Sequence, residues 1–186
     1  MKDVIRLPLD LSAGRLREDL ARIEPENWVP HFNREYYEGD WSAVPLRSLG
    51  GAPRKIYTDP TRDDFADTAI LERCPYIAGV LHGFRCPLRA TRFLRLAAGS
   101  RIREHTDGYL GFEDGQVRIH VPVATNPQVE FFLDGRQIVM QEGEAWYLNF
   151  NLPHRLYNGG ATDRVHLVID CQVNEWIREL LTAASG

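Results

Sequence analysis

The sequence contains little cysteine and no closely spaced cysteine pair. Its three cysteines are Cys74, Cys86 and Cys171, and no two of them form a C-x-x-C motif. Zinc ribbons use such motifs, and disulfide-stabilised domains use an even number of cysteines at short spacings. The sequence therefore favours neither class, and we interpret the three thiols as unpaired groups of a reducing compartment.

The chain also lacks a long apolar run and an excess of positive charge. No apolar stretch approaches the roughly 18 residues that a membrane span requires, and charge interrupts the first six residues, unlike a signal peptide. The formal net charge of −4 disfavours a polyanionic partner. We therefore expect a soluble cytoplasmic protein that binds neither membrane nor nucleic acid.

Length and composition fit one folded domain. A chain of 186 residues suffices for one sizeable core, and its hydrophobic content of 44% is close to the average for soluble domains. We expect a single domain over 1–186. It divides into a helical and loop portion over 1–87, a core of strands over 88–172 and a closing helix over 173–186.

The first 87 residues predict helices around a long aperiodic loop. Ser12 can cap a helix whose apolar residues follow at helical spacing, and Pro75 breaks a second helical pattern. Pro8 restricts the opening strand to a sheet edge, because proline donates no hydrogen bond to a ladder. The expected elements are an edge strand over Val4–Leu9, helices over 12–24 and 63–83, and an ordered loop with short strands over 25–60.

The pattern changes after Pro87, where short strand-like runs follow one another with turn signals between them. Asp134-Gly135 is a strong hairpin signal. Helices do not alternate with these runs, so we predict a mainly β fold with flanking helices, a double-stranded β-helix or cupin-like jelly roll. The expected strands are Ala90–Ala97, Ile102–Thr106, Val117–Val123, Val129–Leu133, Gln137–Gln141, Ala145–Phe150 and Arg164–Cys171, with a last helix over Asn174–Leu181.

Three residues form a candidate metal site. His105 and Asp107 are two apart in a strand and so share a face, which supplies two of the three ligands of a facial triad for non-haem iron(II). The third candidate is His154, which begins a later strand that a jelly roll can fold back onto the same opening. The alternative is a polar surface turn, because a short H-x-D motif also occurs by chance.

Arginine and histidine also occur in runs that are otherwise apolar. Arg164 begins one such run, and Arg118 and His120 share a face of another. A guanidinium among apolar residues is costly unless an anion pairs with it, and a carboxylate is its natural bidentate partner. A bound dicarboxylate would satisfy these groups. A surface ion pair for Arg164 and ordinary buried hydrogen bonds for the histidines remain alternatives.

Together these segments resemble the aspartyl/asparaginyl hydroxylase family of iron(II)- and 2-oxoglutarate-dependent oxygenases, which includes bacterial free-proline hydroxylases. The resemblance extends over most of 28–172 and is strongest over 93–172. The resembling segments are Pro75-Tyr76-Ile77, Leu96-Ala97-Ala98-Gly99, Glu104-His105-Thr106-Asp107, Val117-Arg118-Ile119-His120-Val121-Pro122, Glu142-Gly143-Glu144-Ala145-Trp146, Asn151-Leu152-Pro153-His154 and Arg164-Val165-His166-Leu167-Val168-Ile169-Asp170.

The resemblance implies a dioxygenase that hydroxylates an amino-acid side chain of aspartyl, asparaginyl or proline type, free or in a peptide, and releases succinate and carbon dioxide. The implied cofactors are Fe(II), 2-oxoglutarate and dioxygen, with ascorbate as an accessory reductant. Arg164 is implied to bind the distal carboxylate of 2-oxoglutarate, and Arg118 and His120 are implied to help hold the cosubstrate or the substrate carboxylate. The implied iron ligands are His105, Asp107 and His154.

The sequence departs from parts of the family. The membrane-anchored aspartyl hydroxylases lack the carboxylate that Asp107 supplies, and they have an arginine where this chain has Gln116. The bacterial proline hydroxylases usually have further C-terminal sequence. The substrate and the oligomeric state therefore stay open.

The roles of six further residues stay open, and so do two alternative functions. A cupin-like metalloenzyme of another class and a non-catalytic jelly-roll module that binds a small anion are the alternatives. Some arginines precede the H-x-D motif and either bind a substrate carboxylate or form a solvated basic face, and two tryptophans are either pocket walls or core. These residues are Arg92, Arg95, Arg101, Arg103, Trp28 and Trp41.

Overall fold

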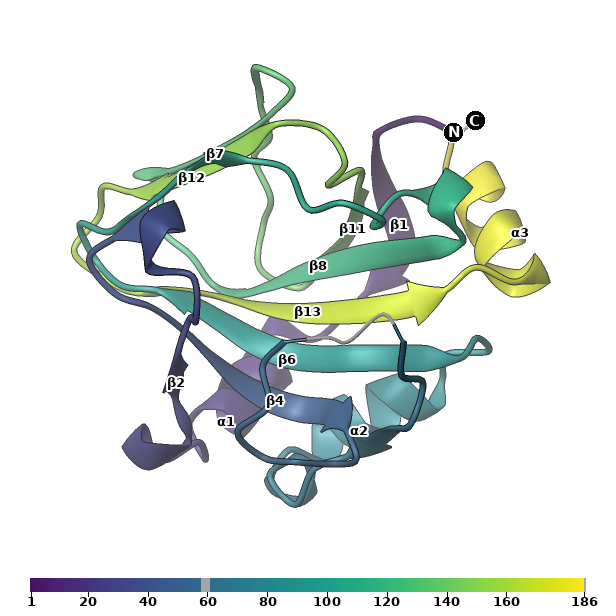
Figure 1. The fold of residues 1–186 in the computed structure, drawn as a ribbon, viewed down its shortest axis with the longest axis horizontal. Helices are drawn as coiled ribbons and strands as arrows, with labels where there is room; N and C mark the ends of the chain where they lie inside the picture. The colour runs from purple at the N-terminus through teal and green to yellow at the C-terminus, as the bar shows by residue number, and fades with distance from the viewer. Residues whose placement is uncertain (58–60, 186) are drawn as a thin grey trace.

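The computed structural model describes residues 1–57 and 61–185, and its strands form two facing antiparallel sheets (Figure 1). This arrangement confirms the predicted mainly β jelly roll. The larger sheet contains, in spatial order, β1 (Val4–Asp10), β11 (Glu144–Leu148), β8 (Gln116–Ala124), β13 (Arg164–Gln172), β6 (Leu88–Leu96), β4 (Trp41–Leu49) and β2 (Val29–Pro30), with β5 (Phe65–Asp67) paired to β4. The smaller sheet contains β10 (Arg136–Gln137), β9 (Val129–Leu133), β12 (His154–Asn158), β7 (Arg101–His105) and β3 (Tyr37–Glu38).

Helices cover the face of the larger sheet that points away from the smaller sheet (Figure 1). We call this the outer face, and the face toward the smaller sheet the inner face. The Ser12 side chain accepts the Arg15 N–H and so caps the first helix, and Pro75 stands in the first turn of the second, where a missing N–H costs nothing. The helices are α1 (Ala13–Leu20), α2 (Pro75–His82) and α3 (Glu175–Ala183), with short 3₁₀ turns η1 (Pro25–Asn27), η2 (Arg34–Tyr36), η3 (Leu71–Arg73) and η4 (Phe112–Asp114).

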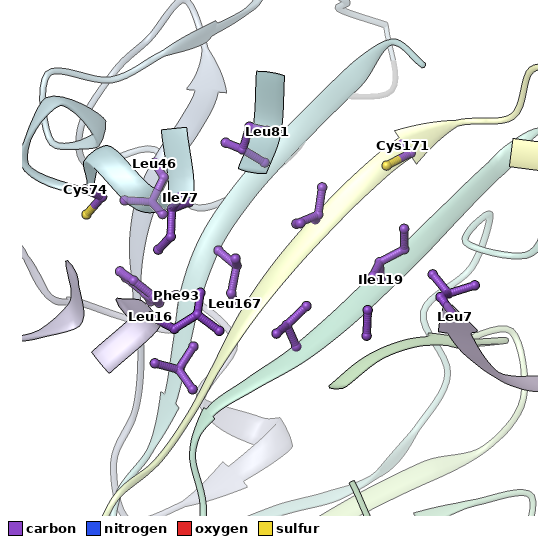
Figure 2. Close-up of a cluster of buried hydrophobic side chains, with 14 of the residues drawn as sticks. Leu7, Leu16, Leu46, Cys74, Ile77, Leu81, Phe93, Ile119, Leu167 and Cys171 are labelled. Atoms are coloured by element: carbon purple, nitrogen blue, oxygen red, sulfur yellow. The ribbon is translucent and has the colours of Figure 1, made fainter. Parts of the chain in front are cut away.

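The main apolar core lies between these helices and the outer face (Figure 2). Phe93 on β6 and Leu167 on β13 pack with Leu16 of α1 and Ile77 of α2, and all four side chains are fully buried. Side chains alternate along a strand. The β13 residues two positions before and after Leu167 therefore also face the helices. The residues between them face the smaller sheet.

A second apolar cluster lies between the two sheets but does not fill the space there. It includes Trp41, Leu96, Phe131, Phe150 and Leu156. Other positions of the inner face, on strands β6, β8 and β13, have charged and polar side chains, and all of these are buried. These residues are Arg92, Arg118, His120, Arg164, His166 and Asp170.

The strands after residue 88 lie close to their predicted places. The Asp134-Gly135 hairpin is confirmed: both residues have a positive φ, 48° and 71°, and join β9 to β10. The expected strand over Gln137–Gln141 is wrong, because β10 covers only Arg136–Gln137. His154 begins β12, as predicted.

The segment before residue 88 holds more strand than the sequence predicts. The expected helix over 63–83 is correct only from Pro75 to His82, since Phe65–Asp67 pairs as β5. The nine-residue strand β4 lies within 25–60. Almost every residue of β4 is buried, so its sequence shows no alternation of apolar and polar residues. No helix in residues 1–57 or 61–185 has both the length and the apolar character that crossing a membrane requires.

Candidate active site

The structure brings His105, Asp107 and His154 together at one end of the smaller sheet. His105 ends β7 and His154 begins β12, and the two are paired directly opposite each other in the ladder. Their ring centroids are 4.2 Å apart. Asp107 follows β7, where its backbone N–H donates to the Phe150 carbonyl at 2.9 Å. One ligand atom from each of the three residues lies within 4.8 Å of the other two.

Backbone carbonyls orient both imidazoles. Nδ1 of His105 lies 2.8 Å from the Arg103 carbonyl oxygen, and Nδ1 of His154 lies 3.1 Å from that of Leu152. A carbonyl only accepts, so each Nδ1 donates its proton to that carbonyl, and Nε2 is the ring nitrogen left for a metal. Burial lowers the pKa of His154 to about 4. Two neutral imidazoles and a carboxylate are the donor set that non-haem iron(II) prefers.

A buried arginine holds the third ligand. Arg118 donates from Nη1 to Oδ2 of Asp107 at 2.6 Å, while Oδ1 of Asp107 lies 3.6 Å from Nε2 of His105. Burial by itself would raise the pKa of Asp107, but the nearby positive charges, that of Arg118 foremost, together outweigh it and hold that pKa below its usual value. Asp107 is therefore an anion with one oxygen directed to the histidines.

Arg118 is itself held by a second carboxylate. Asp170 stands opposite Arg118 in the β8–β13 ladder. Its Oδ1 accepts from Arg118 Nε at 2.7 Å and its Oδ2 accepts from Nη2 at 3.1 Å. Oδ2 also lies 3.2 Å from Nη2 of Arg92. The Nη1 of Arg92 is buried and has no hydrogen-bond partner in the part of the chain that the structure describes.

A cavity of about 310 Å³ opens over Asp107 and Arg92. We call it the outer cavity; it lies on the inner face of the larger sheet, not on the helix-covered outer face. Trp41 forms part of its wall, and His31 stacks on that ring at 3.5 Å between centroids and 12° between planes. Burial lowers the pKa of His31 to about 4, with a further contribution from the Arg92 charge. This cavity combines aromatic walls with the guanidinium of Arg92. Its other aromatic residues are Phe32, Tyr36 and Tyr57.

A second cavity lies deeper between the sheets. This inner cavity is lined by the three candidate ligands together with His120, Arg164, Phe131 and Phe150. Arg164 donates from Nη2 to Nδ1 of His166 at 2.8 Å, and Nδ1 of His120 lies 3.3 Å from the same atom. Arg164 Nε and His120 Nε2 are both buried without a hydrogen-bond partner among residues 1–57 and 61–185.

The charge of Arg164 is uncompensated. Burial lowers its pKa to about 9, which still leaves a cation at neutral pH. The surface ion pair considered from the sequence is absent from the described residues, because Asp163 pairs with Arg95 and Glu144 with Arg6. Among residues 1–57 and 61–185, the hydrogen-bond partner of the Arg164 side chain is the neutral imidazole of His166. A buried cation in that setting favours binding of an anion.

The four arginines before the H-x-D motif point in different directions, according to the strand face on which each lies. Arg92 shares its face of β6 with Leu94 and points inward, whereas Arg95 lies over the Trp28 ring at 4.4 Å. Arg101 and Arg103 pair with Glu38 and are more than half exposed. Asp170 was not predicted as a site residue, and Arg92 was named only as one of four arginines that either bind a substrate carboxylate or form a solvated basic face. The inward parity of Asp170 and Arg92 on buried strands is the sequence signal that points to them.

Comparisons with known proteins agree with this geometry. A model of the family described as aspartyl/asparaginyl beta-hydroxylase matches residues 12–173. An L-proline cis-4-hydroxylase from Rhizobium meliloti is 28% identical over 173 residues, or 90% of this chain and 60% of that protein. This chain thus spans about 60% of the length of that curated relative.

Two solved structures share the fold. A 2OG-Fe(II) oxygenase family oxidoreductase from Burkholderia pseudomallei has a TM-score of 0.55 at 18% identity, covering 92% of this chain and 86% of that one. A prolyl-4-hydroxylase from Pseudomonas putida has a TM-score of 0.54 at 14% identity, with coverages of 92% and 93%. At such identities these likenesses concern the fold.

Proposed function

This chain belongs to the aspartyl/asparaginyl beta-hydroxylase family, and on that premise we propose that it is an iron(II)- and 2-oxoglutarate-dependent oxygenase that hydroxylates an amino acid. The observation that most supports this function is one cavity shared by a His-Asp-His cluster and an uncompensated buried arginine. A metal ligand set and an anion receptor in one chamber fit a metal-chelated dicarboxylate.

The proposed metal ligands are His105 and His154 through Nε2 and Asp107 through Oδ1. When bound, iron(II) and 2-oxoglutarate supply the oxidising chemistry, in which dioxygen and 2-oxoglutarate yield succinate, carbon dioxide and a hydroxylated C–H bond. The chain contributes by keeping His154 neutral and Asp107 ionised. The carbonyl contacts of the two Nδ1 atoms fix the rings before a metal arrives.

Arg164 is the proposed receptor for the far carboxylate of 2-oxoglutarate. Its guanidinium offers a planar fork to that group, and His120 presents an unpartnered Nε2 in the same cavity. Phe131 and Phe150 line the cavity and exclude water, which strengthens each polar contact there. Arg118 was predicted to help hold the cosubstrate or the substrate carboxylate. Its contact with Asp107 favours instead a role in orienting that carboxylate.

The substrate is proposed to be a free amino acid that enters the outer cavity. Arg92 offers its unpartnered Nη1 to a substrate carboxylate, and the stacked rings of His31 and Trp41 offer a flat apolar wall. Such a wall suits a small apolar side chain or ring. The relative from Rhizobium meliloti is named for L-proline, so L-proline is the first candidate.

The test is succinate release by the purified protein with Fe(II), 2-oxoglutarate, ascorbate and dioxygen. We expect a free amino acid, L-proline first, to stimulate release, and its amide to stimulate far less because it lacks the carboxylate. His154→Ala should abolish release, whereas the matched surface variant His82→Ala should retain it.

Other outcomes would favour another class. Dioxygen uptake that needs no 2-oxoglutarate would indicate a different cupin-like metalloenzyme. Tight binding of 2-oxoglutarate without turnover, across free amino acids and peptides, would indicate a non-catalytic anion-binding module. Either result contradicts the proposed function.

A further inference from the structure

Asp170 is a buried carboxylate that contacts none of the three candidate ligands and does not line the two cavities described above. It lies on the inner face of β13 and is 2% exposed. Both of its oxygens accept hydrogen bonds, from Nε and Nη2 of Arg118, and Oδ2 also pairs with Arg92. One carboxylate therefore holds two buried guanidiniums, and their charge in turn keeps its pKa below the usual value despite burial.

The contact with Arg118 leads to the metal ligands. A guanidinium is planar and rigid, so fixing Nε and Nη2 also fixes the direction of Nη1. That Nη1 donates to Oδ2 of Asp107 at 2.6 Å. Asp170 thus sets the orientation of the Asp107 carboxylate indirectly, through Arg118.

The contact with Arg92 leads to the outer cavity. Asp170 holds Nη2 of Arg92 at 3.2 Å, and the remaining Nη1 is the atom without a partner among the described residues. Fixing one nitrogen of the fork fixes where the other is presented. Removing Asp170 would leave two cations close together with only Asp107 nearby, and they would move apart.

We propose that Asp170 is a positioning residue that sets two things at once: the orientation of the metal ligand Asp107, through Arg118, and the presentation of Arg92 to the carboxylate of the substrate. This inference rests on the proposed function for the identity of the metal and substrate. It predicts that a residue touching neither ligand controls the affinity for both.

The first experiment measures Co(II) binding to the whole metal-free protein, which requires no turnover. Asp170→Asn keeps the shape but loses the charge and one acceptor, and we expect the Kd for Co(II) to rise about 10- to 100-fold, as for other residues that orient metal ligands. The matched control is Asp19→Asn. Asp19 is also buried and paired with an arginine, Arg22, but it serves α1 and α2 by accepting the Ile77 N–H. Its substitution should change the Kd less than about twofold, since an effect on stability alone does not alter the site.

A double-mutant cycle tests the route through Arg118. In an Arg118→Gln background, Asp170→Asn should raise the Co(II) Kd by less than about threefold, because the connecting fork is already gone. An unchanged Kd in the single variant, or an equal effect in both backgrounds, would overturn the inference. If Asp170→Asn does not fold, Asp170→Glu keeps the charge and displaces the fork. A Co(II) Kd unchanged in Asp170→Glu would count equally against the proposal.

The second experiment measures the substrate side by steady-state kinetics. Asp170→Asn should raise KM for the free amino acid at least tenfold and leave KM for its amide within about twofold, because only the free acid uses Arg92. Equal changes for acid and amide would contradict the role. A wild-type protein that binds no Co(II) and consumes no 2-oxoglutarate would refute the proposed function itself, whereas an active wild type with an indifferent Asp170→Asn variant would refute only this inference.

Discussion

The two faces of the larger sheet use the same strands for opposite purposes. On β13, Val165, Leu167 and Ile169 face the helices, whereas Arg164 and Asp170 face the smaller sheet, and all are buried. The outer face gains stability from apolar burial. The inner face has to offset the cost of buried charge with internal partners or with ligands. Alternate residues of one strand thus serve different purposes: one set stabilises the fold and the other set lines the candidate site.

The buried arginines of the inner face differ in whether carboxylates of the chain compensate their charge. Arg118 has both Asp107 and Asp170 as partners, so its cost is offset within the chain, and its pKa is raised accordingly. In the part of the chain that the structure describes, Arg164 is paired with a neutral imidazole alone, and its pKa falls to about 9 because burial is not compensated. The first arginine therefore belongs to the scaffold of the site, and the second is the one that we propose binds a ligand.

The largest expected effect is a loss of stability caused by a substitution on the outer face. Phe93→Ala empties the space between β6 and the helices, and Phe93 is fully buried there. Loss of a buried phenylalanine typically costs about 3–5 kcal/mol in the free energy of unfolding. Urea unfolding should show this loss. The variant that remains folded should keep the wild-type KM for 2-oxoglutarate, and a large rise in that KM would contradict the separation of the faces.

The next effect breaks the inner face at Arg164. Arg164→Met should raise the apparent KM for 2-oxoglutarate at least about 30-fold, since a charged bidentate pair worth about 2–4 kcal/mol is lost. The free energy of unfolding without ligand should stay equal or rise, because an uncompensated buried charge is removed. Arg164→Lys should restore affinity only in part. An unchanged KM in Arg164→Met would show that the cosubstrate binds elsewhere.

The sequence was most informative where one physical constraint acts alone. Strands after residue 88 alternate or are bounded by turn residues such as Asp134-Gly135, and they were found close to their places. His105 and Asp107 were predicted to lie together from their spacing, and the structure brings their ligand atoms together although Asp107 lies just beyond the end of β7. The inward direction of Arg164 also followed from spacing, because Val165 and its alternating neighbours need the helix-covered face.

The sequence was least informative where pairing between distant segments decides. Strand β4 is buried on both faces and contains Pro45, so neither periodicity nor propensity marks it. The pairing of Asp170 with Arg118 depends on the register of β13 against β8, which no local pattern gives. Arg92 and Arg95 differ by an odd number of residues on one strand. Only the assembled sheet shows which of the two faces is the inner one.

A smaller effect concerns pH and the histidines of the inner face. Burial, with the Arg164 charge, keeps the pKa of His166 well below its ordinary value, so His166 stays neutral in the folded protein. Below pH about 6.5 the unfolded chain binds a proton that the folded chain does not, so stability falls as pH falls. His166→Asn keeps an acceptor for Arg164 and should reduce the loss between pH 7.5 and 5.5 by about 1.4 kcal/mol. Urea unfolding of metal-free protein measures this, and the surface variant His82→Ala provides the comparison. An unaltered pH dependence in His166→Asn would mean that His166 accepts a proton inside the fold.

The smallest expected effect comes from an arginine that lies outside both buried faces. Arg103 pairs with Glu38 at 3.0 Å, and both side chains are more than half exposed. Exposed pairs of this kind contribute at most about 1 kcal/mol and are weakened further by salt. Its backbone carbonyl, by contrast, accepts from Nδ1 of His105, and a side-chain substitution leaves that carbonyl in place. Arg103→Gln should therefore change the free energy of unfolding by less than about 0.5 kcal/mol and leave the Kd for Co(II) unchanged. A rise of tenfold or more in that Kd would mean that the exposed side chain, and not the carbonyl, orients His105. The division between buried and solvated arginines would then fail at Arg103, two residues before the candidate ligand His105.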